Sequence, residues 1–338
     1  MFYANKVASQ PALMWALEIL ADGSSTVGVQ AATALEHLLR EVYTSPQEDA
    51  WTFSTLTQNG FPVELAISPD EPSIRYTAEV GGPEMPVIMR LLQAERLLNS
   101  LEAGELPAEI MTELRQIQAS GPLKWGAWIG ARHQPDGDRY KLYAEIPPAA
   151  SSQTDALLER FFGCTTLLPD ETAPLVAIGQ TLNSSRIELY FELEQPALKY
   201  WQITYLLRQV GLASRSKDLL GFIEQVRGYS LDQPRPKFPA TTYGFSYALS
   251  TEGAPPIFSI FARIGPLLGG DGQIRSRLLS LADAYGWDLG GYARLTEPLA
   301  NWAFRNEYHN AISFIIGPQG PPALHVALSP PGVLYGES

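Results

Sequence analysis

Hydrophobic and polar residues alternate along ten short runs of the chain, and the runs come in pairs. They lie at 61–68 with 73–80, 124–132 with 139–146, 174–181 with 185–193, 241–249 with 256–264, and 310–316 with 322–328. Each pair is joined by a segment rich in Pro, Gly, Asn, Asp or Ser, such as QPDGD at 134–138. Alternation with a period of two predicts half-buried strands, and such segments predict hairpin turns. We therefore expect five antiparallel hairpins.

Helical patterns fill the stretches between the hairpins, at 85–99, 107–119, 154–162, 197–211, 216–227 and 272–285. In the first of them Val87, Leu91, Ala94 and Leu98 are three or four residues apart, as one apolar stripe of a helix requires. The order of helices followed by a hairpin repeats to the end of the chain. Because no long Gly/Ser-rich or charged linker interrupts this order, residues 1–338 are predicted to form a single domain. The Pro-rich stretch 231–242 is the alternative boundary.

The two faces of the predicted strands differ sharply in polarity. In the run 185–193, Ile187, Leu189 and Phe191 face one way, and Glu188 and Tyr190 face the other. An antiparallel sheet with one apolar face must cover that face, and the amphipathic helices before each hairpin are the available cover. Ten such strands either form an open sheet with a wet polar face or close into a barrel with helices outside. Since about eight strands fill a barrel with side chains, ten would leave a cavity.

Composition and charge narrow the possible partners. With 36 acidic and 24 basic residues the net charge is −12, which argues against a general nucleic-acid binder or an anionic-membrane surface. Cys164 is the only cysteine, so an internal disulfide is impossible, and four histidines make a Cys/His metal cage hard to assemble. The stretch ALMWALEIL at 12–20 is too short to span a bilayer and is expected to be an amphipathic helix. We expect a cytoplasmic protein.

Basic and tyrosine side chains recur on the polar face of the second strand in three hairpins. They are Arg75 in the first, Arg139, Lys141 and Tyr143 in the second, and Arg186 and Tyr190 in the third. On an open sheet this is a solvated face. Inside a lumen these cations would repel one another and lose hydration. Either the carboxylates of Glu145, Glu188 and Glu192 or a bound anionic ligand could compensate for this cost. Arg forks, Lys point charges and Tyr hydroxyls suit a phosphate or diphosphate.

The R-x-K-x-Y motif at 139–143, the R-x-E-x-Y motif at 186–190, and FPVELAIS with IRYTAEV on the first hairpin form an ordered set. Together with the five hairpins, they resemble the aromatic prenyltransferases of the dimethylallyltryptophan synthase type over nearly the whole chain. The resemblance implies an α+β fold of repeated α-α-β-β units. This is the ten-stranded antiparallel prenyltransferase (ABBA) barrel, with an outer ring of helices and the active site in the lumen.

That family joins an allylic diphosphate to an electron-rich aromatic ring, most often an indole, in secondary metabolism. It generally needs no metal or other cofactor, and this sequence has no D-D-x-x-D cluster of the kind that holds diphosphate through Mg²⁺. The resemblance therefore implies a transferase that carries a dimethylallyl or longer prenyl group to an indole or indole alkaloid. Its partners would be a prenyl diphosphate and a small aromatic acceptor.

The resemblance also implies roles for single residues. Arg75, Lys141, Tyr143, Arg186 and Tyr190, with Arg139 beside them, would hold the diphosphate. Glu64 would accept a hydrogen bond from the indole N–H and raise the electron density of the ring. Aromatic faces would shield the allylic cation, each contributing ~0.5–2 kcal/mol through cation–π attraction. The candidates are Trp128, Tyr243, Phe245, Tyr247 and Phe261, although aromatic alternation also builds the core between a sheet and its helices.

Three positions depart from the family pattern. Glu188 stands where the family usually has Lys, and Ser259 and Phe261 stand where a polar residue and a Tyr are usual. The fifth hairpin, with ALHVALSP at 323–330, has no Tyr. We therefore expect a thinner diphosphate site than the family norm, unless other lumen residues compensate. The residues able to do so are Arg132, Arg263 and His325.

Several alternatives stay open at this stage. The base that restores aromaticity is not identified, and His133, His325 and Glu64 are the candidates. The acceptor could instead be a phenolic ring or a peptide side chain on the same fold. Two hypotheses from other functional classes also stay open. The protein could be a barrel that binds an anionic amphipathic ligand without catalysis, or an open-sheet protein that binds a partner.

Overall fold

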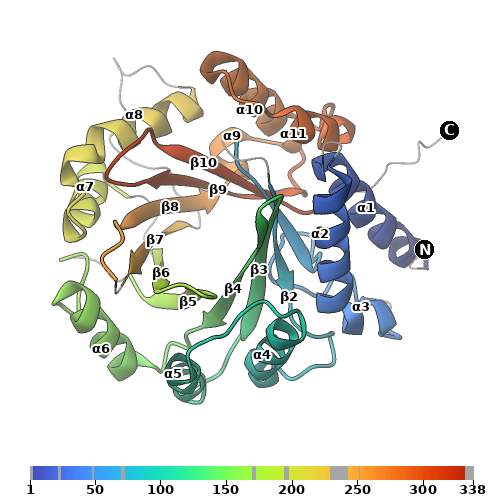
Figure 1. Ribbon diagram of the computed structural model, residues 1–338. Coiled ribbons are helices and arrows are strands. Elements are labelled where there is room, and N and C mark those ends of the chain that lie inside the picture. Colours follow the sequence, from blue (N-terminus) through green and yellow to red (C-terminus); the bar gives the residue numbers. More distant parts are fainter. Residues whose placement is uncertain are drawn as a thin grey trace.

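The computed structural model describes residues 3–21, 24–47, 49–69, 73–169, 173–193, 198–228, 243–250 and 252–331. Within these ranges ten antiparallel strands close into one barrel in the order β1-β10-β9-β8-β7-β6-β5-β4-β3-β2 (Figure 1). The strands are β1 Val63–Ile67, β2 Ile74–Glu79, β3 Ala127–Gln134, β4 Gly137–Glu145, β5 Leu175–Thr181, β6 Arg186–Leu193, β7 Tyr243–Ser250, β8 Ile257–Arg263, β9 His309–Ile316 and β10 Ala323–Leu328. The predicted hairpins and the ten-stranded barrel are confirmed.

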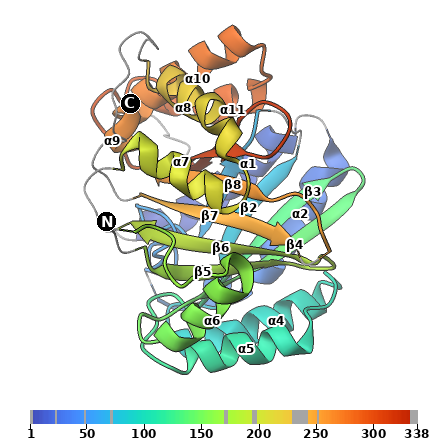
Figure 2. The ribbon, with the colours of Figure 1, turned by 90° about the vertical axis from the view of Figure 1, so that its left-hand side faces the viewer.

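Helices surround the barrel on its outside (Figures 1 and 2). The α-helices are α1 Tyr3–Ala21, α2 Ser25–Leu38, α3 Arg40–Thr44, α4 Arg90–Ser100, α5 Ala108–Gln118, α6 Ser151–Phe162, α7 Tyr200–Gln209, α8 Ser216–Arg227, α9 Gly265–Leu268, α10 Asp271–Tyr285 and α11 Gly290–Leu295. Three short 3₁₀ turns, Val87–Met89, Ala213–Arg215 and Glu297–Leu299, complete the described elements. The predicted helix at 85–99 thus begins as a 3₁₀ turn and continues as α4.

The hydrophobic core lies between the outer face of the barrel and the helices. On β4, Tyr140, Leu142 and Ala144 are buried on the helix side. Leu91 and Leu98 of α4 are buried against the sheet in the same layer, as the apolar stripe predicts. Burying each such leucine stabilises the fold by about 1.5–3 kcal/mol. Since the apolar residues of every strand turn outward to this layer, the alternate residues must line the lumen.

Two further expectations concern the N-terminal helix and the alternative domain boundary. The amphipathic helix expected at 12–20 is the second half of α1. Among the helices in the described ranges, none combines the length and the apolar character that crossing a membrane requires. The alternative domain boundary at 231–242 lies outside the described residues.

Candidate active site

The Lys141 ammonium lies at the centre of a polar cluster in the lumen. It forms an ion pair with Glu188 on β6 and donates a hydrogen bond to the Tyr190 hydroxyl at 2.8 Å. It also lies 4.8 Å and 5.2 Å from the ring centroids of Tyr143 and Tyr190. Ser246 on β7 donates a hydrogen bond to the other Glu188 oxygen at 2.6 Å. The side chains of Lys141 and Glu188 each remain 20% exposed, so solvent reaches both charged groups.

The two charges of this cluster stabilise each other. Burial alone would lower the pKa of Lys141, but Glu188 raises it above its usual value. Burial would likewise raise the pKa of Glu188, but Lys141 and the hydrogen bonds it receives hold that pKa below its usual value. Both groups are therefore ionised at neutral pH. The pair adds no net charge to the lumen.

Two glycines make space for this cluster. A Cβ atom on Gly179, in β5, would collide with the aliphatic end of Lys141. A Cβ atom on Gly130, in β3, would lie 2.8 Å from Cε2 of Tyr143. Real Cβ atoms essentially never come this close, so neither site accepts a larger residue unless its neighbour moves. The glycines thus allow the Lys141 and Tyr143 side chains to lie flat across adjacent strands.

Arg75 lies in the lumen on β2, next to His325 of β10. Its guanidinium donates hydrogen bonds to His325 Nε2 and to Ser73 Oγ, both at 3.1 Å. Burial and the neighbouring Arg132 lower the pKa of Arg75 to about 10. Burial and Arg75 lower the pKa of His325 to about 4. At neutral pH Arg75 is charged and His325 is neutral, which agrees with Arg75 donating to the ring nitrogen.

The remaining two predicted cations lie toward the end of the barrel where the hairpin turns are. Arg139 is exposed and is the register partner of Arg132 on β3. Arg186 is half-buried and donates a hydrogen bond to the carbonyl oxygen of Pro255 at 3.3 Å. The structure therefore brings Lys141 into contact with the two predicted tyrosines, and places the arginines around that cluster rather than within it.

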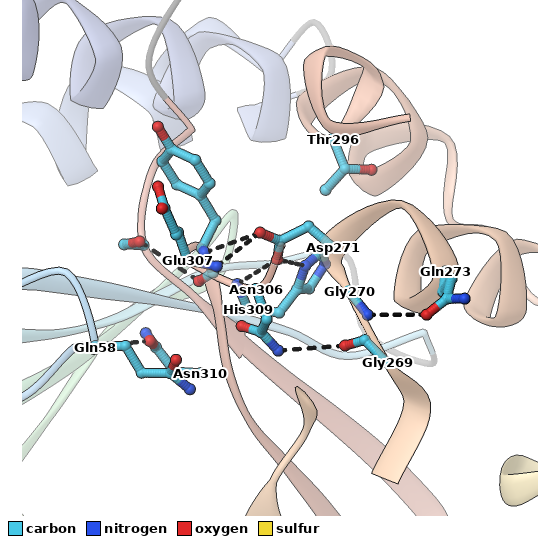
Figure 3. Close-up of polar contacts among 12 residues, drawn as sticks. Gln58, Gly269, Gly270, Asp271, Gln273, Thr296, Asn306, Glu307, His309 and Asn310 are labelled. Carbon is cyan, nitrogen blue, oxygen red and sulfur yellow. Dashed lines mark hydrogen bonds and ion pairs between the residues drawn. The ribbon is translucent and has the colours of Figure 1, made fainter. Parts of the chain in front are cut away.

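Glu64 lies in β1 as the register partner of Thr77 on β2. Burial raises the pKa of its carboxyl group to about 7, while Arg263 and Asn310 act in the opposite direction. Asn310 is fully buried, and its Oδ1 accepts a hydrogen bond from the backbone N–H of Gln58 at 2.9 Å (Figure 3). This bond helps to fix the orientation of the Asn310 amide. Near neutral pH Glu64 changes readily between its protonated and ionised forms.

A buried network outside the lumen holds the strand that carries Asn310. Asp271, the first residue of α10, accepts hydrogen bonds from the backbone N–H of Glu307 at 2.8 Å and of His309 at 3.0 Å (Figure 3). Its carboxylate also bonds to His309 Nδ1 at 2.7 Å, and the opposite ring nitrogen pairs with the Tyr292 hydroxyl at 2.8 Å. Because Asp271 and His309 are fully buried, this network supports the fold and does not meet a ligand.

The predicted aromatic pocket is partly wrong. Trp128 and Phe261 lie in the lumen, where Phe261 is 6.2 Å from the Tyr190 ring and Trp128 stacks on Trp125 at 3.8 Å. Phe245 and Tyr247 instead are fully buried on the helix side, and the Tyr247 hydroxyl donates to the carbonyl of Leu206 at 2.9 Å. On β7 the large residues fill the outer core. The side chain of Tyr243 lies outside the described part of the chain.

Sequence reasoning missed the small residues that line the lumen on β7. Gly244, Ser246 and Ala248 alternate with the aromatic residues of that strand, and Ser246 binds Glu188. The signal was available, because a barrel cavity needs small residues inside while the sheet–helix core needs large ones. Arg263 and Asn310 near Glu64 were not linked to it from the sequence, since strands far apart in the chain bring them together.

The structure also leaves fewer candidates for the base that accepts the proton from the aromatic ring. His133 is fully buried on the outer side of β3, where it bonds to the Tyr76 hydroxyl at 2.9 Å and pairs with Asp138 at 2.9 Å. The prediction that His133 is a possible base is therefore wrong, whereas Glu64 and His325 face the lumen. The described ranges hold no group of three or more His, Cys, Asp or Glu residues placed to bind a metal ion.

No family model and no curated protein matches this sequence. The fold, in contrast, is found in solved structures. The 6-dimethylallyltryptophan synthase of Micromonospora olivasterospora, in complex with DMASPP and Trp, aligns with a TM-score of 0.72 at 20% identity over 94% of this chain and 96% of the other. The 5-dimethylallyltryptophan synthase of Streptomyces coelicolor aligns at 0.73, with 17% identity over 94% and 96% of the two chains. AnaPT from Neosartorya fischeri aligns at 0.64, with 16% identity over 97% and 94%.

The chain has the fold of the dimethylallyltryptophan synthases. Alignments that cover nearly the whole of both chains leave no large segment of the dimethylallyltryptophan synthase fold without a counterpart here. The resemblance that the motifs indicated is thereby confirmed at the level of the barrel.

Proposed function

We propose that this protein is an aromatic prenyltransferase that transfers a dimethylallyl or longer prenyl group from its diphosphate to an indole or indole alkaloid. The observation that carries the proposal is the lumen itself. Inside one closed barrel it combines an ionisable carboxylate, Glu64, with lumen-facing cations and tyrosines. The solved structure of a protein of the same fold in complex with DMASPP and Trp supports a donor and an acceptor of these classes.

The chemistry begins at the donor. Guanidinium, ammonium and hydroxyl groups that face a diphosphate stabilise the negative charge that grows as its bond to the allylic carbon breaks. The bonding electrons leave with the diphosphate, and an allylic cation remains. The aromatic rings of Trp128, Tyr143, Tyr190 and Phe261 lie on this lumen side of the barrel. Such faces attract a cation and keep water from quenching it.

Glu64 acts on the acceptor. In its ionised form the carboxylate accepts a hydrogen bond from the indole N–H, which raises the electron density of the ring where the allylic cation adds. A ring carbon then supplies the electron pair for the new C–C bond. The proton on that carbon leaves to restore aromaticity, and Glu64 and His325 are the lumen-facing groups able to receive it. We include no metal or other cofactor in this scheme, and the prenyl diphosphate is the co-substrate.

The test is product formation by the full chain. The protein is incubated with dimethylallyl, geranyl or farnesyl diphosphate and a panel of tryptophan, cyclic dipeptides and other indoles, with and without Mg²⁺. Products are read by mass spectrometry, and released diphosphate is measured in the same samples. The proposal predicts a prenylated indole and one equivalent of diphosphate per product. Neither product nor diphosphate release with any pair would refute it, and phenols and tyrosine peptides in the panel identify a different acceptor.

One observation favours a second function, a barrel that binds an anionic amphipathic ligand without catalysis. Lys141 is already neutralised by Glu188, and Phe261 stands where the related family usually has a Tyr. A non-hydrolysable prenyl diphosphate analogue distinguishes the two functions. Tight binding of the analogue together with no turnover on any acceptor would establish the binding protein.

A further inference from the structure

Arg263 is the last residue of β8, so it lies at the end of the barrel away from the hairpin turn that leads into this strand. Ile260 and Ala262 are buried on the helix side, which places Arg263 on the lumen face. Its side chain is half-buried and forms no hydrogen bond or ion pair with another described residue. A guanidinium carries several N–H donors and no acceptor. These donors are therefore available to a ligand.

A row of alanines connects Arg263 to the strand of Glu64. Arg263 is the register partner of Ala311 on β9, Ala311 is the partner of Ala327 on β10, and Ala327 is the partner of Ala66 on β1. We call Ala311, Ala327 and Ala66 the alanine row. Glu64 precedes Ala66 by two residues and shares its face of β1. Because each side chain of the row is a single methyl group, the row places no bulky side chain between Arg263 and Glu64.

The charges of Arg263 and Glu64 interact without neutralising each other by contact. Burial raises the pKa of Glu64, and the positive charge of Arg263 opposes this effect. No ion pair or hydrogen bond joins the two side chains. Glu192 on β6 is a further carboxylate at this end of the barrel, but β7 lies between β6 and β8, and no ion pair joins it to Arg263. A ligand with an N–H donor for Glu64 and an anionic group for Arg263 would complement both residues.

Arg263 lies far along its strand from the cluster of Lys141 and Glu188. Ser246, which binds Glu188, is the register partner of Ser259 on β8. Arg263 follows Ser259 by four residues, which span about 13 Å along a strand. This separation favours a role for Arg263 with the acceptor, beside Glu64, over the role in the diphosphate site that the sequence suggested.

We propose that Arg263 is a specificity-determining residue that binds a carboxylate of the acceptor, and that the acceptor is therefore an indole bearing a carboxylate group. This rests on the proposed function and specifies its substrate class. The carboxylate accepts N–H bonds from the guanidinium fork while the indole N–H donates to Glu64, and the apolar part of the acceptor lies along the alanine row. A neutral indole alkaloid or a cyclic dipeptide offers no anion, so it would leave the guanidinium without a partner.

A matched pair of acceptors tests the assignment on the full chain. Indole-3-propionate and indole-3-propionamide differ only in the exchange of the carboxylate for an uncharged amide. With the prenyl diphosphate that gives the fastest turnover, we expect the wild type to prefer the acid at least about tenfold in kcat/KM. Arg263→Gln should lower kcat/KM for the acid at least about tenfold and for the amide less than about threefold. Arg263→Lys keeps the charge but loses the fork, so its preference should be intermediate.

Arg208→Gln, on the exposed side of α7, is the matched loss of one positive charge and should keep the preference of the wild type. Circular dichroism and thermal unfolding check that each variant is folded. A structural role of Arg263 would lower the rates with acid and amide equally, which overturns the assignment. Equal use of both acceptors by the wild type overturns it as well. So does an Arg263→Gln variant that binds inorganic diphosphate at least about tenfold more weakly, because that places Arg263 in the donor site.

Calorimetric titration with the same two compounds, in the presence of a non-reactive prenyl thiolodiphosphate, separates this proposal from the proposed function. Binding of the acid that exceeds binding of the amide and depends on Arg263, with no prenylated product from any acceptor, keeps the carboxylate site and refutes the enzyme. Prenylation of both compounds at equal rates keeps the enzyme and refutes the carboxylate site. A wild-type protein that binds neither compound refutes the carboxylate site too.

Discussion

Replacing Glu64 with Gln removes the carboxylate proposed to hold the indole N–H while it keeps the size and shape of the side chain. Positioned groups of this kind typically contribute about 100- to 10,000-fold to rate, so turnover should fall by a factor in that range. Binding of the prenyl diphosphate should change little, because Glu64 acts on the acceptor and the cations that face the donor are untouched. The acceptor KM is expected to rise less than kcat falls.

The role of Glu64 also predicts how the rate of prenylation depends on pH. Burial raises the pKa of Glu64 to about 7, with Arg263 and Asn310 opposing the shift. The ionised fraction then grows from about one tenth at pH 6 to about nine tenths at pH 8. Since only the ionised carboxylate accepts the N–H hydrogen bond, kcat/KM for the indole should rise nearly tenfold over this interval in the wild type. The Glu64→Gln variant has no such group and should show a flat profile.

The assay measures initial rates of prenylated product by liquid chromatography and mass spectrometry, at saturating donor, from pH 5.5 to 9. Glu109→Gln, on the exposed surface of α5, is the matched control and should keep both the rate and the pH profile of the wild type. A wild-type profile that is flat between pH 6 and 8 would refute the role given to Glu64. A Glu64→Gln variant that retains the wild-type pH dependence would refute it equally.

Three further predictions concern stability and packing. Because the pKa of Glu64 is raised in the folded protein from 4.5 to about 7, the stability linked to this group is present at low pH and lost as the pH rises through that range. Urea unfolding should therefore show Glu64→Gln to be more stable than the wild type by about 2–3 kcal/mol at pH 8, and by less at pH 5. Gly130→Ala would push against the Tyr143 ring, so overpacking should cost about 1–3 kcal/mol in the same assay and reduce turnover. Tyr247→Phe removes the 2.9 Å hydrogen bond to Leu206. It should cost about 1–2 kcal/mol of stability with unchanged kinetics, and a large kinetic effect would return Tyr247 to the active site.

The barrel was predictable from the sequence because each strand repeats one simple rule. Apolar residues such as Leu142 and Leu189 turn to the helices, and Lys141 and Tyr190 turn inward, with hairpin turns setting the register between them. A period of two carries this information locally, without knowledge of distant contacts. The contact of Lys141 with Tyr190 followed from the same pattern once three hairpins were aligned.

The aromatic residues of β7 show where such reasoning fails. Alternation states that Phe245 and Tyr247 share a face but does not say which face of the strand is inside. The rest of the strand decides it, since Ser246 fits the lumen and the large rings fill the core beside Leu206. Deciding which face of a strand lines the lumen therefore requires comparing the sizes of the residues on both of its faces.

The contacts of Glu64 and Glu188 could not be predicted for a different reason. The Lys141–Glu188 ion pair joins adjacent hairpins, and the departure at Glu188 was visible in the sequence, but its partner was not. The contact of Glu64 with Asn310 crosses from the first hairpin to the last and depends on barrel closure. The periodicity of a strand predicts which of its residues share a face. Which residues of distant strands become neighbours across a closed barrel depends on the register of all the strands.

We propose that donor and acceptor meet in this lumen beside Glu64. The most direct test is a crystal structure of the full chain with a non-reactive prenyl thiolodiphosphate and an indole that the enzyme converts. We predict diphosphate oxygens on lumen cations such as Arg75 and Lys141, and an indole nitrogen about 2.6–3.2 Å from a Glu64 oxygen. An indole bound outside the lumen, or bound inside with its nitrogen turned away from Glu64, would contradict it.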